Sequence, residues 1–148
     1  MSSVARIAAL IGLLAACDTA HPTYARVRND YPSETGMVVS KVWWSVALFA
    51  ESIASTEESE QVRVVPATES AYALLTLQDG RLLPVRTANE LSVARGKTLV
   101  IDISESNVLG DCEHGVPLSQ EDADFITQRI FPDDFEGVTY DAATCTAH

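Results

Sequence analysis

The sequence predicts a mostly β fold: an antiparallel β-sandwich with one α-helix near the C-terminal end. Six or seven short runs of β-branched, aromatic or alternating apolar residues recur between residues 24 and 104, separated by turn-forming residues. No long helical pattern interleaves these runs, which favours antiparallel pairing. Beyond residue 104 the chain turns polar and then takes on a helical pattern, so the helix is expected to follow the strands.

Three strands are expected before Pro66. Residues 24–29 predict an edge strand, and residues 61–65 alternate as a half-buried strand. Residues 37–49 form the most hydrophobic segment of the body, and their β-branched and aromatic density favours a strand over the alternative, a helix with one apolar stripe. Trp43 would face away from the core, either as a partner or sugar contact or under the C-terminal helix. The core face would carry Val38, Val42, Trp44, Val46 and Leu48.

Asp79-Gly80 marks an expected hairpin. It separates the apolar runs 70–78 and 81–87, and Asp-Gly between two such runs is a strong hairpin signal. Pro84 has no amide hydrogen to donate, so the return strand is expected at an edge or a bulge.

A second hairpin is expected from residues 90–94 and 98–104, joined by a turn at 95–97. Its second strand alternates, so Leu99, Ile101 and Ile103 should face inward and Asp102 outward.

One helix is expected at about residues 119–131. Ser119 and Asp122 fit a capping box, in which the Ser119 side chain accepts from the third helical amide and Asp122 reaches back. The helix should end before Pro132. Its inward face would carry Phe125, Ile126 and Ile130.

Residues 1–16 have the proportions of a secretory signal. Arg6 precedes an apolar run, 7–16, that is too short to cross a bilayer, since a spanning helix needs roughly 20 residues. The run ends in Leu14-Ala15-Ala16-Cys17, which resembles the lipobox of bacterial lipoproteins. An ordinary cleaved signal with a cysteine nearby is the alternative.

The lipoprotein resemblance implies how the mature chain is organised. In that family the cysteine receives a diacylglycerol and becomes the first mature residue. Cys17 would then anchor the protein to a membrane of the bacterial cell envelope, with Asp18 favouring the inner membrane by the rule known for enteric bacteria. Residues 17–23 would form a lipidated tether and residues 24–148 a single domain. The rhythm of the body also resembles immunoglobulin-like envelope domains, a likeness of fold alone.

The charge balance excludes one class of partner. The whole chain carries 10 basic and 21 acidic residues, and removal of residues 1–16 with Arg6 leaves 9 against 21, a net charge of −12. Residues 98–148 hold eleven acids against Arg129 alone. Such a chain should repel nucleic acid and anionic head groups. A cationic partner or a divalent cation remains open beside the simpler reading of a solvated acidic surface.

Cys112 and Cys145 form an even pair once Cys17 is lipidated. In an oxidising compartment they predict a disulfide, which would contribute about 3–4 kcal/mol through chain entropy. A last short strand at 137–140 would bring them together. The alternative is a tetrahedral zinc site formed by Cys112, His114, Cys145 and His148.

A second metal alternative is calcium at Asp133-Asp134-x-Glu136, although that spacing does not match the twelve-residue EF-hand loop. We therefore predict neither a metal site nor a cofactor.

The search for catalytic residues finds little. The sequence has no Gly-x-Ser-x-Gly elbow, no His-Glu-x-x-His and no phosphate-binding glycine loop. Its histidines are His21, His114 and His148, of which His114 stands beside Asp111 and Glu113. The leading hypothesis is a lipid-anchored, non-catalytic envelope domain that binds an unknown envelope protein or polymer. The alternative is a small periplasmic hydrolase or metal-binding protein that uses His114 and nearby acids.

Overall fold

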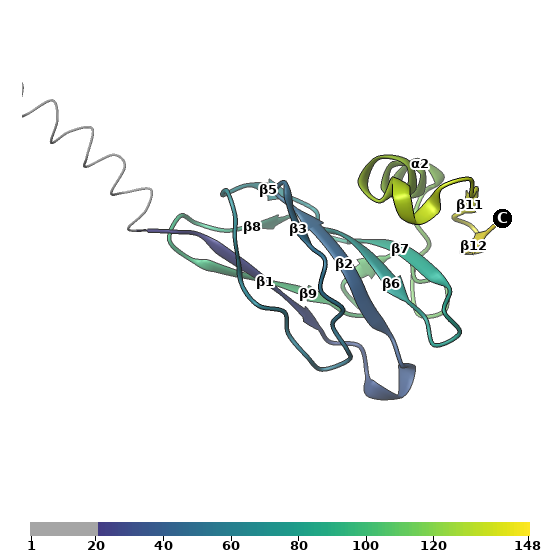
Figure 1. Cartoon of the computed structure of the whole chain (residues 1–148), viewed down its shortest axis with the longest axis horizontal. Helices are drawn as coiled ribbons and strands as arrows, with labels where there is room; N and C mark the ends of the chain where they lie inside the picture. Colours follow the sequence, from purple (N-terminus) through teal and green to yellow (C-terminus); the bar gives the residue numbers. More distant parts are fainter. Residues whose placement is uncertain (1–20) are drawn as a thin grey trace, which may run out of the picture.

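The computed structural model describes residues 21–148, so the predicted signal and Cys17 lie outside the described residues. Two facing sheets form a sandwich, and a helical layer with a small hairpin packs on the outer face of the larger sheet (Figure 1). The smaller sheet has the order β4-β1-β9, with bounds Val62–Arg63, Tyr24–Asn29 and Thr98–Ile103. The larger has the order β10-β7-β6-β2-β3, with bounds Val108–Leu109, Leu82–Thr87, Tyr72–Thr76, Val38–Trp44 and Ala47–Phe49.

The remaining elements are short. Two further strand pairs are β5 (Thr68–Glu69) with β8 (Leu91–Ser92), and β11 (Tyr140–Asp141) with β12 (Thr146–Ala147). The helical segments are η1 (Ser33–Thr35), α2 (Gln120–Phe125), η2 (Ile126–Ile130) and η3 (Pro132–Phe135). The predicted mostly β sandwich with a C-terminal helix is confirmed. Within residues 21–148, no helix combines the length and hydrophobicity that crossing a membrane requires.

Alternation along the strands places the main core between the two sheets. Val27 and Ile101 from the smaller sheet meet Val42, Trp44 and Leu75 from the larger, and all five are fully buried. Successive side chains of a strand point to opposite faces. Leu74, next to Leu75, is therefore buried on the other face of the larger sheet, in a second core beneath the helices. Both faces of this sheet are covered.

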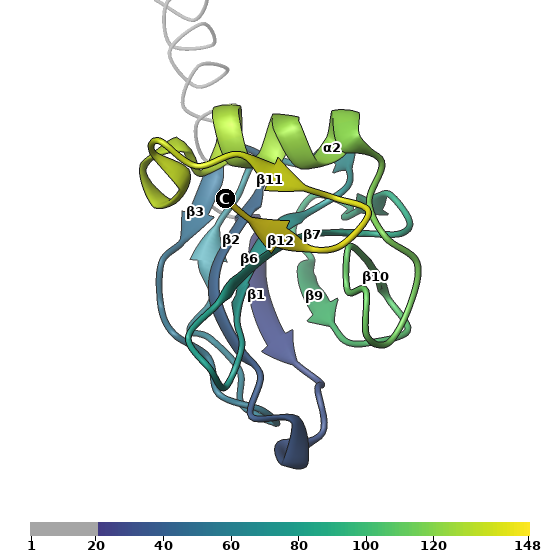
Figure 2. The same ribbon diagram turned by 90° about the vertical axis from the view of Figure 1, so that its right-hand side faces the viewer.

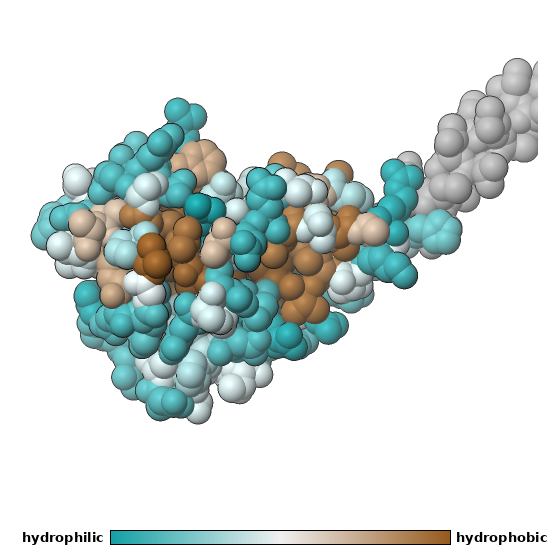
Figure 3. Space-filling model, turned by 180° about the vertical axis from the view of Figure 1, so that it is seen from behind, coloured by the Kyte–Doolittle hydropathy of each residue, from teal (hydrophilic) through white to brown (hydrophobic). Residues whose placement is uncertain are grey.

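The C-terminal helix crosses the strands of the larger sheet (Figure 2). Its second core joins Leu74 to Ala123, Ile126 and Phe131, with Trp43 packed against their cluster. Trp43 thus faces away from the sandwich core and lies under the helical layer, which is the second of the two positions predicted for it. Hydrophobic surface remains on the rear of the molecule, where β8 and β9 lie (Figure 3).

The first predicted hairpin is confirmed. β6 and β7 pair antiparallel from Tyr72↔Arg86 to Thr76↔Leu82 around the Asp79-Gly80 turn. Thr87 donates its amide to Ala71, so by alternation the nitrogen of Pro84 points to the other edge of β7. There β10 pairs only with Arg86 and Thr87, and the missing donor of Pro84 costs no ladder bond.

The single strand predicted for residues 37–49 is wrong, because the segment folds into a hairpin, β2–β3. Ser45 and Val46 form its two-residue turn with φ values of 49° and 57°. A register shift between Val39 and Lys41 then turns Val39, rather than Val38, into the core. The predicted inward positions hold for Val42 and Trp44, whereas Val38 is half-buried and Val46 and Leu48 are exposed.

The second predicted hairpin is also wrong. β8 pairs antiparallel with β5, while β9 pairs in parallel with β1 along all six of its residues. β1 lies between β4 and β9, so it is not the predicted edge strand. The inward positions of Ile101 and Ile103 are confirmed, and Leu99 is half-buried. The long parallel ladder buries the core face of β9 in a way that the local turn signal at 95–97 does not reveal.

The predicted helix exists but differs in its details. The Ser119 side chain accepts from the Asp122 amide at 3.1 Å, as the capping box requires. The Asp122 carboxylate instead accepts from Arg86 Nε of β7 at 3.0 Å. After α2 the chain forms a π-helical turn, closed by the amide of Phe131 donating to the Ile126 carbonyl. Ile126 is buried and Ile130 is half-buried. The expected inward position of Phe125 is wrong, because it is 42% exposed and its ring packs edge-on against Tyr72.

Candidate functional site

The Cys112–Cys145 disulfide is present and joins the loop after β10 to the start of β12, with the two Cα atoms 6.1 Å apart. Gly110, just before this loop, has a φ of 116°, and a Cβ there would lie 2.7 Å from the carbonyl oxygen of Pro84. Only glycine allows such a close approach in that backbone conformation. The glycine on one side and the disulfide on the other therefore hold residues 110–115 against β7.

Asp111 organises this loop from within. Its carboxylate is 2% exposed, and its Oδ2 accepts from Tyr31 Oη at 2.9 Å and lies 2.9 Å from His114 Nδ1. Its Oδ1 accepts from the Glu113 amide at 3.2 Å, and its carbonyl accepts from the Gly115 amide at 2.9 Å. A buried carboxylate is tolerated when its oxygens are satisfied in this way.

Asp111 also sets the electrostatics of the loop. The hydrogen bond with Asp111 raises the pKa of His114 above its ordinary value. Burial opposes this as the second-largest effect, and the charges of Asp111, Glu105 and Glu113 raise the pKa further. The Nε2 atom of His114 lies 3.9 Å from Glu105 Oε1. Burial, followed by the charge and the hydrogen bond of Asp111, raises the pKa of Tyr31, so its hydroxyl stays protonated and donates.

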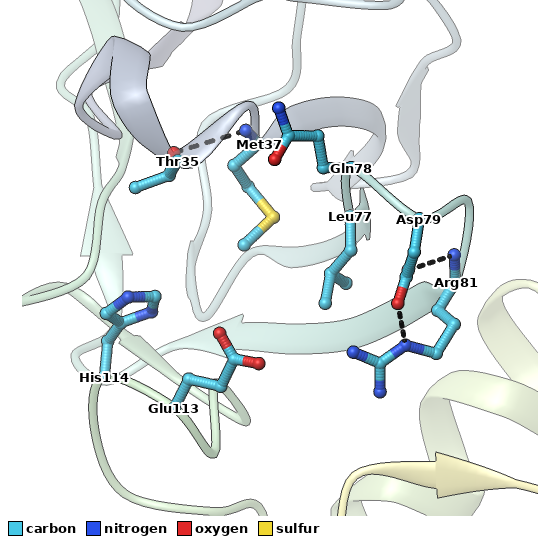
Figure 4. Close-up of a pocket in the computed structure, with 8 residues that line it drawn as sticks. All are labelled: Thr35, Met37, Leu77, Gln78, Asp79, Arg81, Glu113 and His114. Atoms are coloured by element: carbon cyan, nitrogen blue, oxygen red, sulfur yellow. Dashed lines mark hydrogen bonds and ion pairs between the residues drawn. The ribbon is translucent and has the colours of Figure 1, made fainter.

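His114 lines a cavity of about 330 Å³, and its side chain is 30% exposed. Glu113 and His114 lie on one side of this cavity, and the Asp79–Arg81 turn lies across from Glu113 (Figure 4). The lining also includes Thr35, Met37, Leu77 and Gln78. Most of these groups are polar or charged, and both signs of charge are present.

The arrangement can bind and exchange protons more readily than it can attack a substrate. Arg81 Nε donates to Asp79 Oδ2 at 2.6 Å, which fixes a guanidinium at the rim. Thr35, the only hydroxyl-bearing residue among those lining the cavity, donates to the Pro32 carbonyl at 2.7 Å and accepts from the Met37 amide at 3.2 Å. Its hydroxyl is therefore already engaged on both sides. The cavity suits a small polar group or side chain that carries charge or hydrogen-bonding groups.

The metal alternatives find no support among residues 21–148, where no three His, Cys, Asp or Glu side chains gather as a metal would need. Both cysteines of the imagined zinc site are joined to each other. In the imagined calcium site, Asp134 Oδ2 instead lies 2.8 Å from Lys41 Nζ.

Sequence reasoning identified His114 and the two cysteines but missed Tyr31 and Arg81. Tyr31 lies in a turn-forming stretch, and nothing local links it to Asp111, 80 positions away. Arg81 directly follows the Asp79-Gly80 turn, so the hairpin signal placed it at the start of the return strand but did not link it to His114. A second cavity of about 400 Å³, lined mainly by apolar side chains such as Leu82, Phe135 and Val138, was also not anticipated.

Comparison with known proteins gives no match: no family model, curated protein or solved structure is significantly similar to this chain.

Proposed function

We propose that this protein is a lipid-anchored, non-catalytic binding domain of the bacterial cell envelope, and that it binds its partner at the cavity beside His114. The observation that carries the binding role is the charged lining. Glu113, His114 and Arg81 face one concavity, and the buried Asp111 and the disulfide hold the loop that presents the first two. Preorganised polar groups of this kind lose little entropy on binding.

The envelope location rests on the sequence Leu14-Ala15-Ala16-Cys17, which resembles a lipobox. The disulfide supports it, because disulfides persist in oxidising compartments such as the periplasm. The partner is an envelope protein or polymer that presents a polar or charged group to the cavity. The strongly acidic surface favours a cationic partner.

The anchor is tested by growing cells with radiolabelled palmitate. The wild-type protein should incorporate label, and Cys17→Ser should not. Equal labelling of both proteins would refute the anchor. A Cys145→Ser variant is the matched control, since it loses a cysteine but keeps the lipobox.

The binding site is tested by photo-crosslinking in intact envelopes. A benzophenone amino acid at Glu113 should yield a discrete crosslinked product, which His114→Ala in the same protein should weaken. The same probe at Gln128, exposed on the helical layer, is the control. The cavity is not the binding site if neither position crosslinks, or if both give the same product.

A small hydrolase is the second candidate function, and the Asp111–His114 pair is the observation that favours it. A carboxylate 2.9 Å from Nδ1 orients a histidine as a general base. The hydrolase reading expects turnover of p-nitrophenyl acetate or p-nitrophenyl phosphate that His114→Ala abolishes. Hydrolysis no faster than that by free imidazole would contradict the hydrolase function, and only the binding role would remain.

A further inference from the structure

The end of the sandwich where the described chain begins is built from three loops and the first residues of the chain. Thr23 connects them: its carbonyl accepts from the Val64 amide at 2.9 Å, and its Oγ1 accepts from the Gly96 amide at 3.1 Å. The Ser45 hydroxyl donates to the Val65 carbonyl at 2.5 Å. We call this surface, residues 21–24, 44–46, 63–69 and 94–98, the tether-side end.

Two valines protrude from the tether-side end. Val46 is 75% exposed and Val65 is 63% exposed. Val46 also sits in the hairpin turn with a φ of 57°, a conformation that disfavours β-branched side chains. An exposed valine in a strained turn contributes neither core packing nor good turn geometry. An outlier of this kind points to a role outside the fold itself.

The charged residues of the tether-side end are mostly cationic. The tether-side end carries the cations Arg63, Arg95 and Lys97 and one carboxylate, Glu69, whose Oε1 already accepts from the Ser45 amide at 2.7 Å. Most of the acids of residues 98–148 lie outside this end, in the loops after β9, the helical layer and the C-terminal hairpin, where Arg129 is the only base. The residues of the tether-side end therefore carry a net positive charge, although the chain as a whole is acidic.

The chain also leaves little distance between this end and the predicted anchor. Three residues separate Cys17 from His21, which makes four steps along the chain, and a fully extended chain spans at most about 3.3–3.6 Å per residue. Whatever their conformation, these residues hold His21 within about 14 Å of a lipidated Cys17. A surface held so close to a bilayer meets head groups at a high effective concentration, so weak contacts are enough.

We propose that the tether-side end docks on an anionic bilayer, with Val46 and Val65 entering the interface and the nearby cations meeting lipid phosphates. The proposal rests on the lipid anchor of the proposed function. Two valines and a few cations would not hold a free protein on a membrane, but they can orient one that is already anchored. Docking turns the cavity at His114, which lies beside the Asp79–Arg81 turn at the other end of the larger sheet, away from the membrane and toward a partner.

The two lysines of the chain provide the test. Lys97 lies at the tether-side end, whereas Lys41 lies on β2 beside Asp134. The full-length lipoprotein is reconstituted into phosphatidylglycerol vesicles and, separately, into phosphatidylcholine vesicles. Acetylation of each lysine by an N-hydroxysuccinimide ester is followed by mass spectrometry. We expect acetylation of Lys97 to be at least threefold slower on phosphatidylglycerol and that of Lys41 to be unchanged.

Substitutions separate docking from nonspecific shielding. Val46→Asp and Val65→Asp should restore rapid acetylation of Lys97. Val116→Asp is the matched control, because Val116 is 62% exposed but lies in the loop beside the disulfide, and it should leave the protection intact. Equal labelling of Lys97 on both lipids in a protein that carries fatty acid would overturn docking and leave the anchor standing. A protein that fails to incorporate palmitate and does not float with vesicles would overturn the anchor itself.

Discussion

His114 Nδ1 lies 2.9 Å from Oδ2 of Asp111, and that buried oxygen also accepts a hydrogen bond from Tyr31 at 2.9 Å. One carboxylate thus connects the loop after β10 to the loop after β1. The contact orients the His114 ring, whose Nε2 lies 3.9 Å from Glu105 Oε1. The position and the protonation of His114 therefore both depend on Asp111.

The first prediction concerns the titration of His114. Its pKa should lie above the ordinary value of about 6.5, chiefly because Asp111 accepts a hydrogen bond from the ring. Asp111→Asn should lower that pKa, since it removes the charge but keeps the shape. An NMR titration of the His114 resonances measures both values. An unchanged pKa in the variant would contradict the contact.

The same pKa sets a pH dependence of stability. Since folding raises the pKa of His114, the protonated form is favoured in the native state. The resulting stabilisation is complete below the unfolded value, about 6.5, and is lost as the pH rises through the folded value. His114→Gln should therefore lose stability relative to wild type at pH 5.5 and much less at pH 8.5. Urea unfolding at the two pH values measures this difference.

Loss of the Asp111 side chain should destabilise the fold. Asp111→Ala leaves the buried hydroxyl of Tyr31 without its acceptor and opens the turn that carries Glu113. An unsatisfied buried polar group costs about 1–3 kcal/mol of unfolding free energy. Glu113→Ala is the control, because its side chain is exposed, and it should stay within about 0.5 kcal/mol of wild type. Chemical denaturation compares the two variants.

Local signals predicted the parts of the fold that local chemistry decides. Asp79-Gly80 predicts a hairpin because glycine readily adopts the backbone conformation that such a turn needs. Ser119 predicts a helix start because its side chain accepts from the amide three residues further on. The pairing of Cys112 with Cys145 followed from counting, once Cys17 was assigned to the lipid. Each of these predictions needed only neighbouring residues or the number of cysteines in the chain.

The remainder depended on contacts between distant parts of the chain. The parallel pairing of β1 with β9 joins segments that no turn connects, so nothing near residues 95–97 distinguishes it from a hairpin. Ser45-Val46 is not one of the Asn-Gly or Asp-Gly pairs that predict a two-residue hairpin turn, yet pairing of β2 with both β3 and β6 imposes the turn there. The His114 site likewise depends on residues distant in sequence, because Tyr31 shares the Asp111 carboxylate with His114 and Arg81 lines the cavity.

The disulfide should be a major contributor to stability. It closes a loop with a sequence separation of 33, for which the chain-entropy model gives about 3–4 kcal/mol. Reduction should lower the Tm of the wild-type protein and leave unchanged the Tm of a Cys112→Ser, Cys145→Ser double variant. Thermal melting with and without reductant measures this effect. A reductant-insensitive wild type would contradict it, provided that alkylation and mass spectrometry show the bond to be broken.

Asp102 should make the protein less stable as the pH rises from about 4 to about 6. Burial, together with the hydrogen bond and charge of Asp30, raises the pKa of Asp102 to about 6. The native state therefore favours the protonated carboxyl, and this stabilisation is present below about 4 and lost between about 4 and 6. Asp102→Asn imitates the protonated form and should be more stable than wild type at pH 8, but not at pH 3.5. Asp124→Asn, on the helical layer, serves as the control in urea unfolding.

Val46 should reveal a conflict between stability and surface chemistry. Its turn needs positive φ at both central residues, and an L-residue with a side chain pays roughly 1–2 kcal/mol for that conformation. Val46→Gly should therefore raise the unfolding free energy by about 1 kcal/mol, because the valine is too exposed for its loss to open a cavity. Val65→Gly is the control: Val65 is also exposed but has no positive φ to relieve, so this substitution should stabilise nothing. If Val46→Gly is more stable but no longer protects Lys97 from acetylation on anionic vesicles, Val46 lowers the stability of the protein and contributes to membrane docking. A variant no more stable than wild type would show that the turn accommodates valine without strain.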